Sequence, residues 1–216
     1  MMLFLLAALL FGSNKALSEN SESDPGAVTP EIIKVEADDV KNNSIFFKIH
    51  TIGKVDMIFV KYRDVRSFFE VKLHWKFEGS GPYEVKNLMA SSEYDFRFAL
   101  NVPGHWSRPY IFTTLPEKPV FIVGGLSDGS LKVEWSLRTD DNSRKTIDKH
   151  ELSYYSVINQ GHTWQKKDCA IVVEIPSCSE SRFTITSLEK GSYYEIRLRA
   201  HTASGYGEPY YLKVHP

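Results

Sequence analysis

The sequence predicts an all-β fold made of two similar β-sandwiches in tandem. In SLEKGSYYEIRLRAHTASGYG, at residues 187–207, apolar and polar side chains alternate with the period of two that is typical of a half-buried strand. The same pattern occurs one hundred residues upstream, in YEVKNLMASSEYDFRFAL at residues 83–100. A chain of 216 residues has room for two domains of about 90 to 100 residues, each with its own core.

Short alternating segments separated by turn residues supply the strands that two sandwiches need. In the first copy they lie at residues 31–37, 45–51, 56–63, 70–77, 83–88, 94–101 and 110–113. In the second copy they lie at residues 120–123, 131–135, 150–157, 163–166, 171–175, 183–188, 193–202 and 210–214. The second copy is longer, and we expect its extra residues in loops such as the polar segment SLRTDDNSRKT.

In both copies a leucine is followed six residues later by the tyrosine that opens the long strand, as Leu88 and Tyr94 and as Leu188 and Tyr194. This arrangement resembles the tyrosine corner of fibronectin type III domains, in which the phenol ties the preceding loop to the strand. The resemblance implies immunoglobulin-like, seven-stranded sandwiches in which Tyr94 and Tyr194 are structural anchors.

The first copy departs from this family at the end of its second strand. The tryptophan usual there is present in the second copy as Trp135, but the first copy has Ile49. We expect phenylalanines to fill the space, although alternation allows only some of them to point inward. The candidates are Phe46, Phe47, Phe59, Phe96 and Phe98.

The junction between the two copies is predicted at residues 115–119, with the sequence LPEKP. Pro116 and Pro119 lack amide donors and stiffen a short extended link. The domains then span residues 30–114 and 120–216. The linker is similar to the tight elbows between tandem fibronectin type III modules.

The N-terminal segment predicts secretion. LFLLAALLF, at residues 3–11, is too short to span a bilayer but suits the core of a signal peptide. Small residues at Ala16 and Ser18 place the end of this signal peptide at residue 18, and the acidic residues 19–29 are expected to form a disordered leader. No later segment is long and apolar enough for a transmembrane helix. We therefore expect a secreted or extracellular protein, or the ectodomain of a longer membrane protein.

Composition argues against several classes of function. With 26 basic and 27 acidic residues the net charge is −1, which gives no long-range field for nucleic acid or an anionic membrane. The seven histidines are scattered, and no metalloprotease, serine-hydrolase or phosphate-binding motif occurs. We expect no catalytic site, no cofactor and no metal.

Two covalent features are expected outside the cell. Cys169 and Cys178 are the only cysteines, and so close a pair in an oxidising compartment is interpreted as one local disulfide, with the chain reversing at Pro176 and Ser177. Asn42 begins the glycosylation triplet Asn-Asn-Ser, in a predicted turn where a glycan could stay in water.

Large side chains in loops are the candidates for binding a partner, because such sandwiches bind through loops and edges. Trp106 and Arg108 lie in the loop NVPGHWSR, which we place near the linker, and Tyr206 lies in the equivalent loop of the second domain. Alternatively, Trp106 packs against the linker or the sheet beneath it. Phe68 and Phe69 raise the same question on another edge.

Three functions remain open at this point. The first is an extracellular, non-catalytic module for protein binding or cell adhesion, whose partner is an extracellular protein or cell-surface receptor. The second is a soluble cytokine-receptor-like ectodomain, since YGEPY at residues 206–210 lies where that family carries its Trp-Ser-x-Trp-Ser box, although the first domain lacks the cysteines of those receptors. The third is an auxiliary module of a secreted enzyme.

Overall fold

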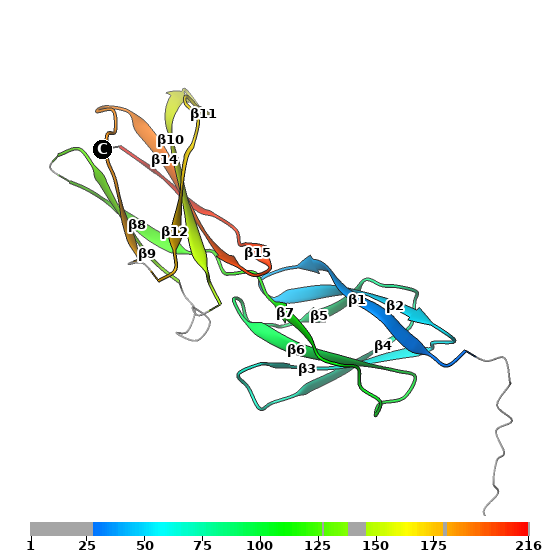
Figure 1. Ribbon diagram of the computed structural model, residues 1–216. Helices are drawn as coiled ribbons and strands as arrows, with labels where there is room; N and C mark the ends of the chain where they lie inside the picture. Colours follow the sequence, from blue (N-terminus) through cyan, green and yellow to red (C-terminus); the bar gives the residue numbers. More distant parts are fainter. Residues whose placement is uncertain (1–27, 127, 138–145, 179–180, 216) are drawn as a thin grey trace, which may run out of the picture.

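The computed structural model describes residues 28–126, 128–137, 146–178 and 181–215. The predicted signal peptide and most of the leader lie outside the described residues. The described chain is all-β and forms two sandwiches joined by the linker (Figure 1). None of its described segments forms a helix able to cross a bilayer.

The first sandwich packs a three-stranded sheet against a four-stranded sheet. The three-stranded sheet has the order β1-β2-β5, and the four-stranded sheet has the order β4-β3-β6-β7. The strands are β1 (Glu31–Val40), β2 (Ser44–Ile52), β3 (Met57–Asp64), β4 (Val71–Lys76), β5 (Tyr83–Lys86), β6 (Glu93–Leu100) and β7 (Tyr110–Thr113). Each lies within a few residues of the position that alternation predicts.

Phenylalanines fill the core of the first sandwich, as expected because Ile49 stands where the second domain has Trp135. Phe47, Phe96 and Phe98 are fully buried, and the ring of Phe47 meets those of Phe96 and Phe98 edge-on at 4.9 and 5.5 Å. Phe46 and Phe59 occupy the alternate, outward positions and remain half-buried.

The second sandwich has the same plan, except that two short strands, rather than one, form one edge of its larger sheet. One sheet has the order β13-β9-β8, and the other is built around β10 and β14. The 12-residue β10 pairs along one side with β14, and along its other side first with β12 and then with β11. The strands are β8 (Val120–Gly125), β9 (Leu131–Ser136), β10 (Lys149–Gln160), β11 (Thr163–Lys166), β12 (Ile171–Pro176), β13 (Arg182–Ile185), β14 (Tyr193–Thr202), β15 (Gly205–Tyr206) and β16 (Tyr210–Val214).

Both corner tyrosines hold the loop that precedes their strand. The hydroxyl of Tyr94 accepts a 2.8 Å hydrogen bond from the backbone N–H of Met89, and that of Tyr194 accepts a 2.9 Å bond from the N–H of Glu189. Both rings are buried. Burial raises the pKa of Tyr94 above its ordinary value, so the phenol stays neutral.

The direction of the strands decides which loops lie at which end of the first sandwich. Glu93, at the start of β6, faces Thr113, which leads into the linker. Leu100, at the other end of β6, faces Ile58. The β1–β2 and β3–β4 turns therefore lie at the linker end, and the β6–β7 loop lies at the free end (Figure 1).

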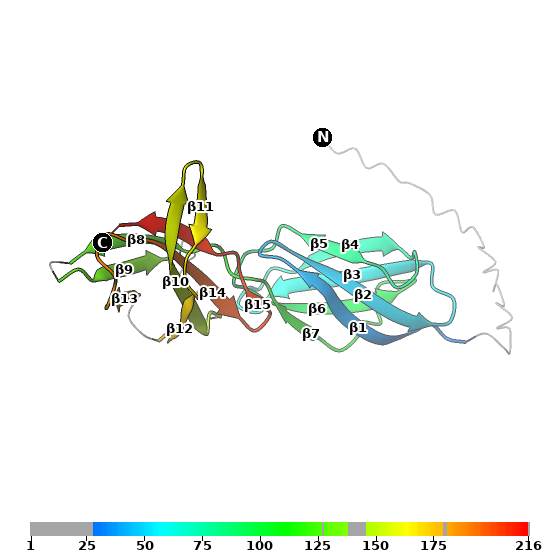
Figure 2. The same cartoon turned by 90° about the horizontal axis from the view of Figure 1, so that it is seen from above.

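The linker is packed against the second domain rather than suspended between the two. The Thr202 hydroxyl donates a 3.2 Å hydrogen bond to the carbonyl of Thr114, and the Ser204 hydroxyl donates to the carbonyl of Thr113. A Cβ at Gly207 would clash with the carbonyl oxygen of Pro116. In both views β15 accordingly lies against the linker end of the first sandwich (Figure 2).

Candidate partner-binding site

The most exposed large apolar side chains lie in the turn between β3 and β4. Phe68 is 97% exposed and Phe69 is 86% exposed. Burial of a phenylalanine side chain contributes about 1.5 to 3 kcal/mol, and neither ring gains it within this chain. An adjacent pair left in water at one turn indicates an interaction surface.

A buried carboxylate fixes the shape of this turn. Asp64, at the end of β3, accepts hydrogen bonds from the backbone N–H of Arg66 at 2.9 Å and from its guanidinium at 2.9 and 2.8 Å. The Asp64 carbonyl also accepts the N–H of Ser67, whose hydroxyl in turn accepts the N–H of Phe69 at 3.1 Å. The two phenyl rings therefore project from a backbone that is already ordered.

The turn lies at the end of the first sandwich that faces the second domain. The backbone N–H of Val65 donates to the carbonyl of Glu93, and Arg66 donates a 3.2 Å bond to the hydroxyl of Ser92. The neighbouring carbonyl of Ser91 accepts a hydrogen bond from the hydroxyl of Thr146, in the second domain. The exposed rings thus lie beside the junction.

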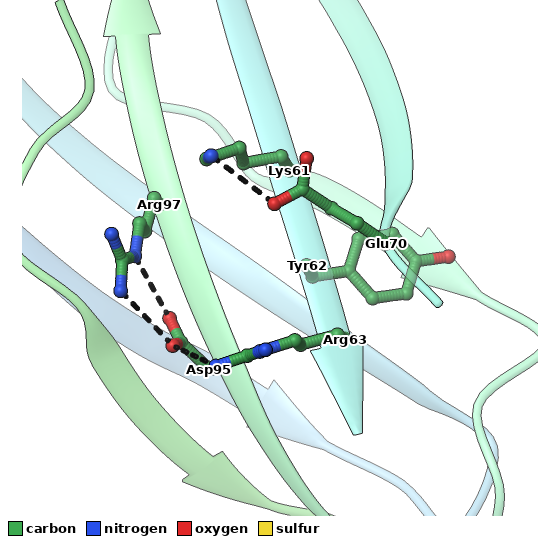
Figure 3. A pocket seen from close by; sticks show the side chains of 6 residues that line it. All are labelled: Lys61, Tyr62, Arg63, Glu70, Asp95 and Arg97. Atoms are coloured by element: carbon green, nitrogen blue, oxygen red, sulfur yellow. Dashed lines mark hydrogen bonds and ion pairs between the residues drawn. The ribbon is translucent and has the colours of Figure 1, made fainter. Parts of the chain in front are cut away.

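Charged side chains on the outer face of the four-stranded sheet form a polar hollow beside this turn (Figure 3). Lys61 lies 3.1 Å from Glu70, while Arg63 and Arg97 lie 3.9 and 3.4 Å from Asp95. Three cations thus meet two carboxylates. The hollow has a small excess of positive charge and no unpaired carboxylate among these five.

The prediction that Trp106 and Arg108 lie near the linker is wrong. The β6–β7 loop lies at the free end of the first domain, because β6 runs away from the linker. At this end the Asn101 side chain accepts a 2.8 Å hydrogen bond from the N–H of Asp56 and donates a 2.9 Å bond to the carbonyl of Lys54, which ties the loop to the β2–β3 turn. Trp106 is half-buried under the ammonium of Lys61, which lies 4.9 Å from the ring centroid. Arg108 is exposed beside it.

Tyr206, by contrast, lies at the junction. Its ring lies 4.0 Å from the guanidinium carbon of Arg199, and its hydroxyl donates a 3.1 Å bond to Glu174. The hydrogen bond from Lys149 holds the pKa of Glu174 below its ordinary value, so this carboxylate stays charged. Tyr206 thus belongs to the second domain beside the linker, whereas Trp106 lies at the free end of the first domain, so the structure does not bring the two together.

The predicted disulfide is contradicted. Cys169 and Cys178 are free, exposed thiols. They flank β12, an extended strand of six residues that spans about 20 Å, whereas the Cα atoms of a disulfide lie about 4.4 to 6.8 Å apart. Residues 176 and 177 therefore do not reverse the chain early enough to bring the thiols together.

Asn42 is exposed in the β1–β2 turn, where the N–H of Lys41 bonds the carbonyl of Ser44 at 2.8 Å. It shares a shallow groove with Leu115 and Pro116 of the linker. A glycan on Asn42 would accordingly extend into water beside the junction.

The described residues contain no group of three or more histidine, cysteine, aspartate or glutamate side chains that could hold a metal ion. His150 is buried against the Trp135 ring at 5.5 Å, and desolvation lowers its pKa. This imidazole is part of the core of the second domain.

Sequence and structure comparisons identify the second domain directly. The family profile "Fibronectin type III domain" matches residues 116–213. Among curated protein sequences, none matches the chain.

Two solved structures illustrate the similarity. One is a two-fibronectin type-III domain segment from chicken tenascin, with 18% identity, a TM-score of 0.44, and coverage of 86% of this chain and 99% of that one. The other comprises the FN1–FN3 domains of chicken CNTN1, with 18% identity, a TM-score of 0.39, and coverage of 87% of this chain and 67% of that one. Both TM-scores are below 0.5, so the assignment rests on the family profile and on the strand order. Residues 116–213 belong to the fibronectin type III family, and, with a first sandwich of the same plan, the chain is a protein of tandem fibronectin type III domains.

Proposed function

We propose that this chain is an extracellular, non-catalytic binding module that holds a protein partner at the β3–β4 turn. The observation that carries the proposal is the exposure of Phe68 and Phe69 on an ordered turn. A few side chains buried at the centre of an interface carry most of the energy of binding, and aromatic residues, phenylalanine among them, are enriched in interfaces.

The geometry of the turn keeps the cost of binding low. Association normally costs about 0.5 to 1.5 kcal/mol for each flexible side chain that must be ordered, and the ordering of a loop adds to this cost. Because Asp64 already holds Arg66 and Ser67 in place, the backbone under both rings needs no further ordering. This supports a preformed binding site rather than a loop that folds around its partner.

The surroundings of the two rings indicate the kind of surface that fits them. Lys61, Arg63 and Arg97 outnumber the carboxylates of the adjacent hollow by one. A partner with an apolar pocket and an acidic rim would complement this turn, and its acidic groups would favour the correct orientation on approach.

The extracellular setting rests on the predicted signal peptide and on the exposed triplet at Asn42. Expression in secreting animal cells should yield a chain whose mass falls on treatment with peptide-N-glycosidase. Asn42→Gln should abolish that shift and Asn43→Gln should preserve it. A chain retained inside the cell would count against the setting.

A second partner-binding surface at the free end of the first domain is supported by a separate observation. His105, Trp106 and Arg108 line an open groove with the N-terminal residues of β1, where Ile33 is 62% exposed. If this groove also binds protein, its partner lies at the other end of the first domain from Phe68.

The test is an unbiased capture from cell surfaces and secreted proteins with the immobilised chain, followed by affinity measurement on the partner obtained. Replacement of both Phe68 and Phe69 by serine should weaken binding by at least about thirtyfold, which corresponds to about 2 kcal/mol. The matched control replaces Ile111 and Ile122, two exposed apolar residues on strands, by serine. Equal affinity of the phenylalanine variant and the wild type would move the site elsewhere.

A further inference from the structure

We propose that two copies of this chain associate through β4, in an antiparallel pair centred on Leu73, so that two four-stranded sheets become one continuous sheet. This inference is separate from the proposed partner-binding function, because Phe68 and Phe69 precede β4 and lie outside the paired residues 70–76. The occupant of the open strand is a second copy of the chain.

β4 is an open edge. In the part of the chain that the structure describes, it pairs with β3 alone. An edge strand presents a row of unpaired backbone N–H and C=O groups, which another strand can satisfy. The six residues of β4 offer such a row without a proline to interrupt it.

Apolar side chains remain exposed along this edge. Val71 is 44% exposed and Leu73 is 36% exposed. They face Tyr62 and Val60 in the register with β3, both of which are buried in the core. Val71 and Leu73 therefore lie on the core side of the sheet, but no further strand covers them. A second β4 would shield this apolar strip.

The charges along β4 favour one antiparallel register. With Leu73 facing Leu73, Glu70 of each copy faces Lys76 of the other, and Val71 faces Trp75. The pair thus has an opposite-charge contact at both ends and apolar contacts on the core side, while Lys72 faces His74 on the solvent side. Opposite-charge and apolar cross-strand pairs of this kind stabilise a sheet. The relation is two-fold, as a closed homodimer requires.

Neighbouring registers are disfavoured by like charges. A pair centred on Lys72 brings the two copies of Lys72 together, and a pair centred on His74 places Lys72 opposite Lys76 and Glu70 opposite Glu78. A shift by a single residue would set core-side side chains against solvent-side ones, which the pleat of a continuous sheet does not allow. The sequence of β4 therefore specifies its own pairing.

The corresponding edge of the second domain lacks this pattern. β12 is also six residues long, but it ends at Pro176, which has no N–H to donate. A two-fold pair centred on Val173 would place Glu174 opposite Val172, with no opposite charge to meet it. The inference therefore concerns the first domain alone.

The interface is small, so the association should be weak and dependent on concentration. A ladder of the seven residues 70–76 buries less than the roughly 1,200 Å² of a standard interface. We expect monomer and dimer to exchange in sedimentation equilibrium of the intact mature chain at concentrations up to about 1 mM, the range in which weak contacts are populated.

A charge exchange tests the register. Lys76→Glu should weaken the dimer at least tenfold, because glutamate would face Glu70 at both ends, and Glu70→Lys should do the same because lysine would face Lys76. The double variant Glu70→Lys/Lys76→Glu should restore association. The double variant also lacks the 3.1 Å ion pair between Glu70 and Lys61. Its restored association would therefore show that the single changes act on the contact between copies and not through the loss of this ion pair.

A cross-link gives a second readout. In a chain with Cys169→Ser and Cys178→Ser, Leu73→Cys should form a disulfide-linked dimer in oxidised glutathione, whereas Val71→Cys should cross-link much less because it faces Trp75. Circular dichroism should show that every variant is folded, and Phe68→Ser/Phe69→Ser should dimerise like the wild type. A monomer at all concentrations, a dimer unaffected by the single charge changes, or a double variant no better than the singles would overturn the proposal.

Discussion

The hydroxyl of Thr202, at the end of β14, donates a 3.2 Å hydrogen bond to the carbonyl of Thr114, the residue that follows the last strand of the first domain. Both residues are fully buried. The long strand of one sandwich is thereby tied to the exit of the other. The loss of this one hydroxyl group should therefore be enough to change the junction.

Thr202→Val should loosen the junction. The change keeps the shape of the side chain but leaves the buried carbonyl of Thr114 without this donor, which costs about 1 to 3 kcal/mol. We expect a lower midpoint of thermal unfolding of the second domain and a broader distance distribution in small-angle scattering. Thr184→Val, on an exposed position of β13, is the control. Identical scattering profiles for the two variants would contradict the role of this bond.

Tyr94→Phe and Tyr194→Phe should each destabilise their own domain. Each change removes the hydroxyl that accepts a backbone N–H five residues upstream and keeps the buried ring. A loss of about 1 kcal/mol lowers the midpoint of thermal unfolding by about 4 to 8 °C in a domain of this size. The exposed Tyr211→Phe should leave both transitions in place. Unchanged midpoints in the corner variants would mean that these hydrogen bonds contribute nothing.

His150 should make the stability of the second domain fall in mild acid. Desolvation holds its pKa in the folded chain below the ordinary value of 6.5, so the unfolded chain binds a proton that the folded chain resists. The contribution of the neutral His150 imidazole to the free energy of unfolding is therefore fully present above pH 6.5, and it declines as the pH falls toward the lowered pKa. Urea unfolding of the intact chain at several pH values measures this slope. His150→Leu should flatten it, and a slope equal to that of the wild type would exclude His150 as its source.

Both cysteines should react with iodoacetamide in the folded chain, because both are exposed and β12 holds them apart. Mass spectrometry of a digest under non-reducing conditions should show two alkylated peptides. A peptide joined between Cys169 and Cys178 would mean that β12 is not extended as described.

The strands could be predicted from the sequence because local alternation and the internal repeat carry the same information. β14 runs from Tyr193 to Thr202, as its pattern predicts, and the corner tyrosines stand at equivalent places. Period two also predicted that only some of the phenylalanines point inward, since Phe47 and Phe46 must point to opposite faces, but the structure was needed to show that Phe47 is the buried one.

The candidate site depended on relations that no local pattern contains. To place Trp106, one must know the direction of β6 relative to the linker. Trp106 lies only nine residues before Leu115 in the sequence, but the antiparallel pairing of β6 and β7 sets it at the opposite end of the sandwich. Pairing the cysteines failed for a related reason, because the residues between them form an extended strand. The exposure of Phe68 could not be read from a sequence in which an apolar loop residue can as well fold back onto the sheet.

Gly207 has a consequence for the length of the linker. Its missing side chain leaves the space occupied by the carbonyl of Pro116, while Thr114, two residues earlier, meets Thr202. One added or deleted residue in the linker would withdraw both contacts together. The spacing of Thr114 and Pro116 is therefore matched to the surface of the second domain. A flexible tether would tolerate any length sufficient to join the domains, whereas this linker requires its present number of residues.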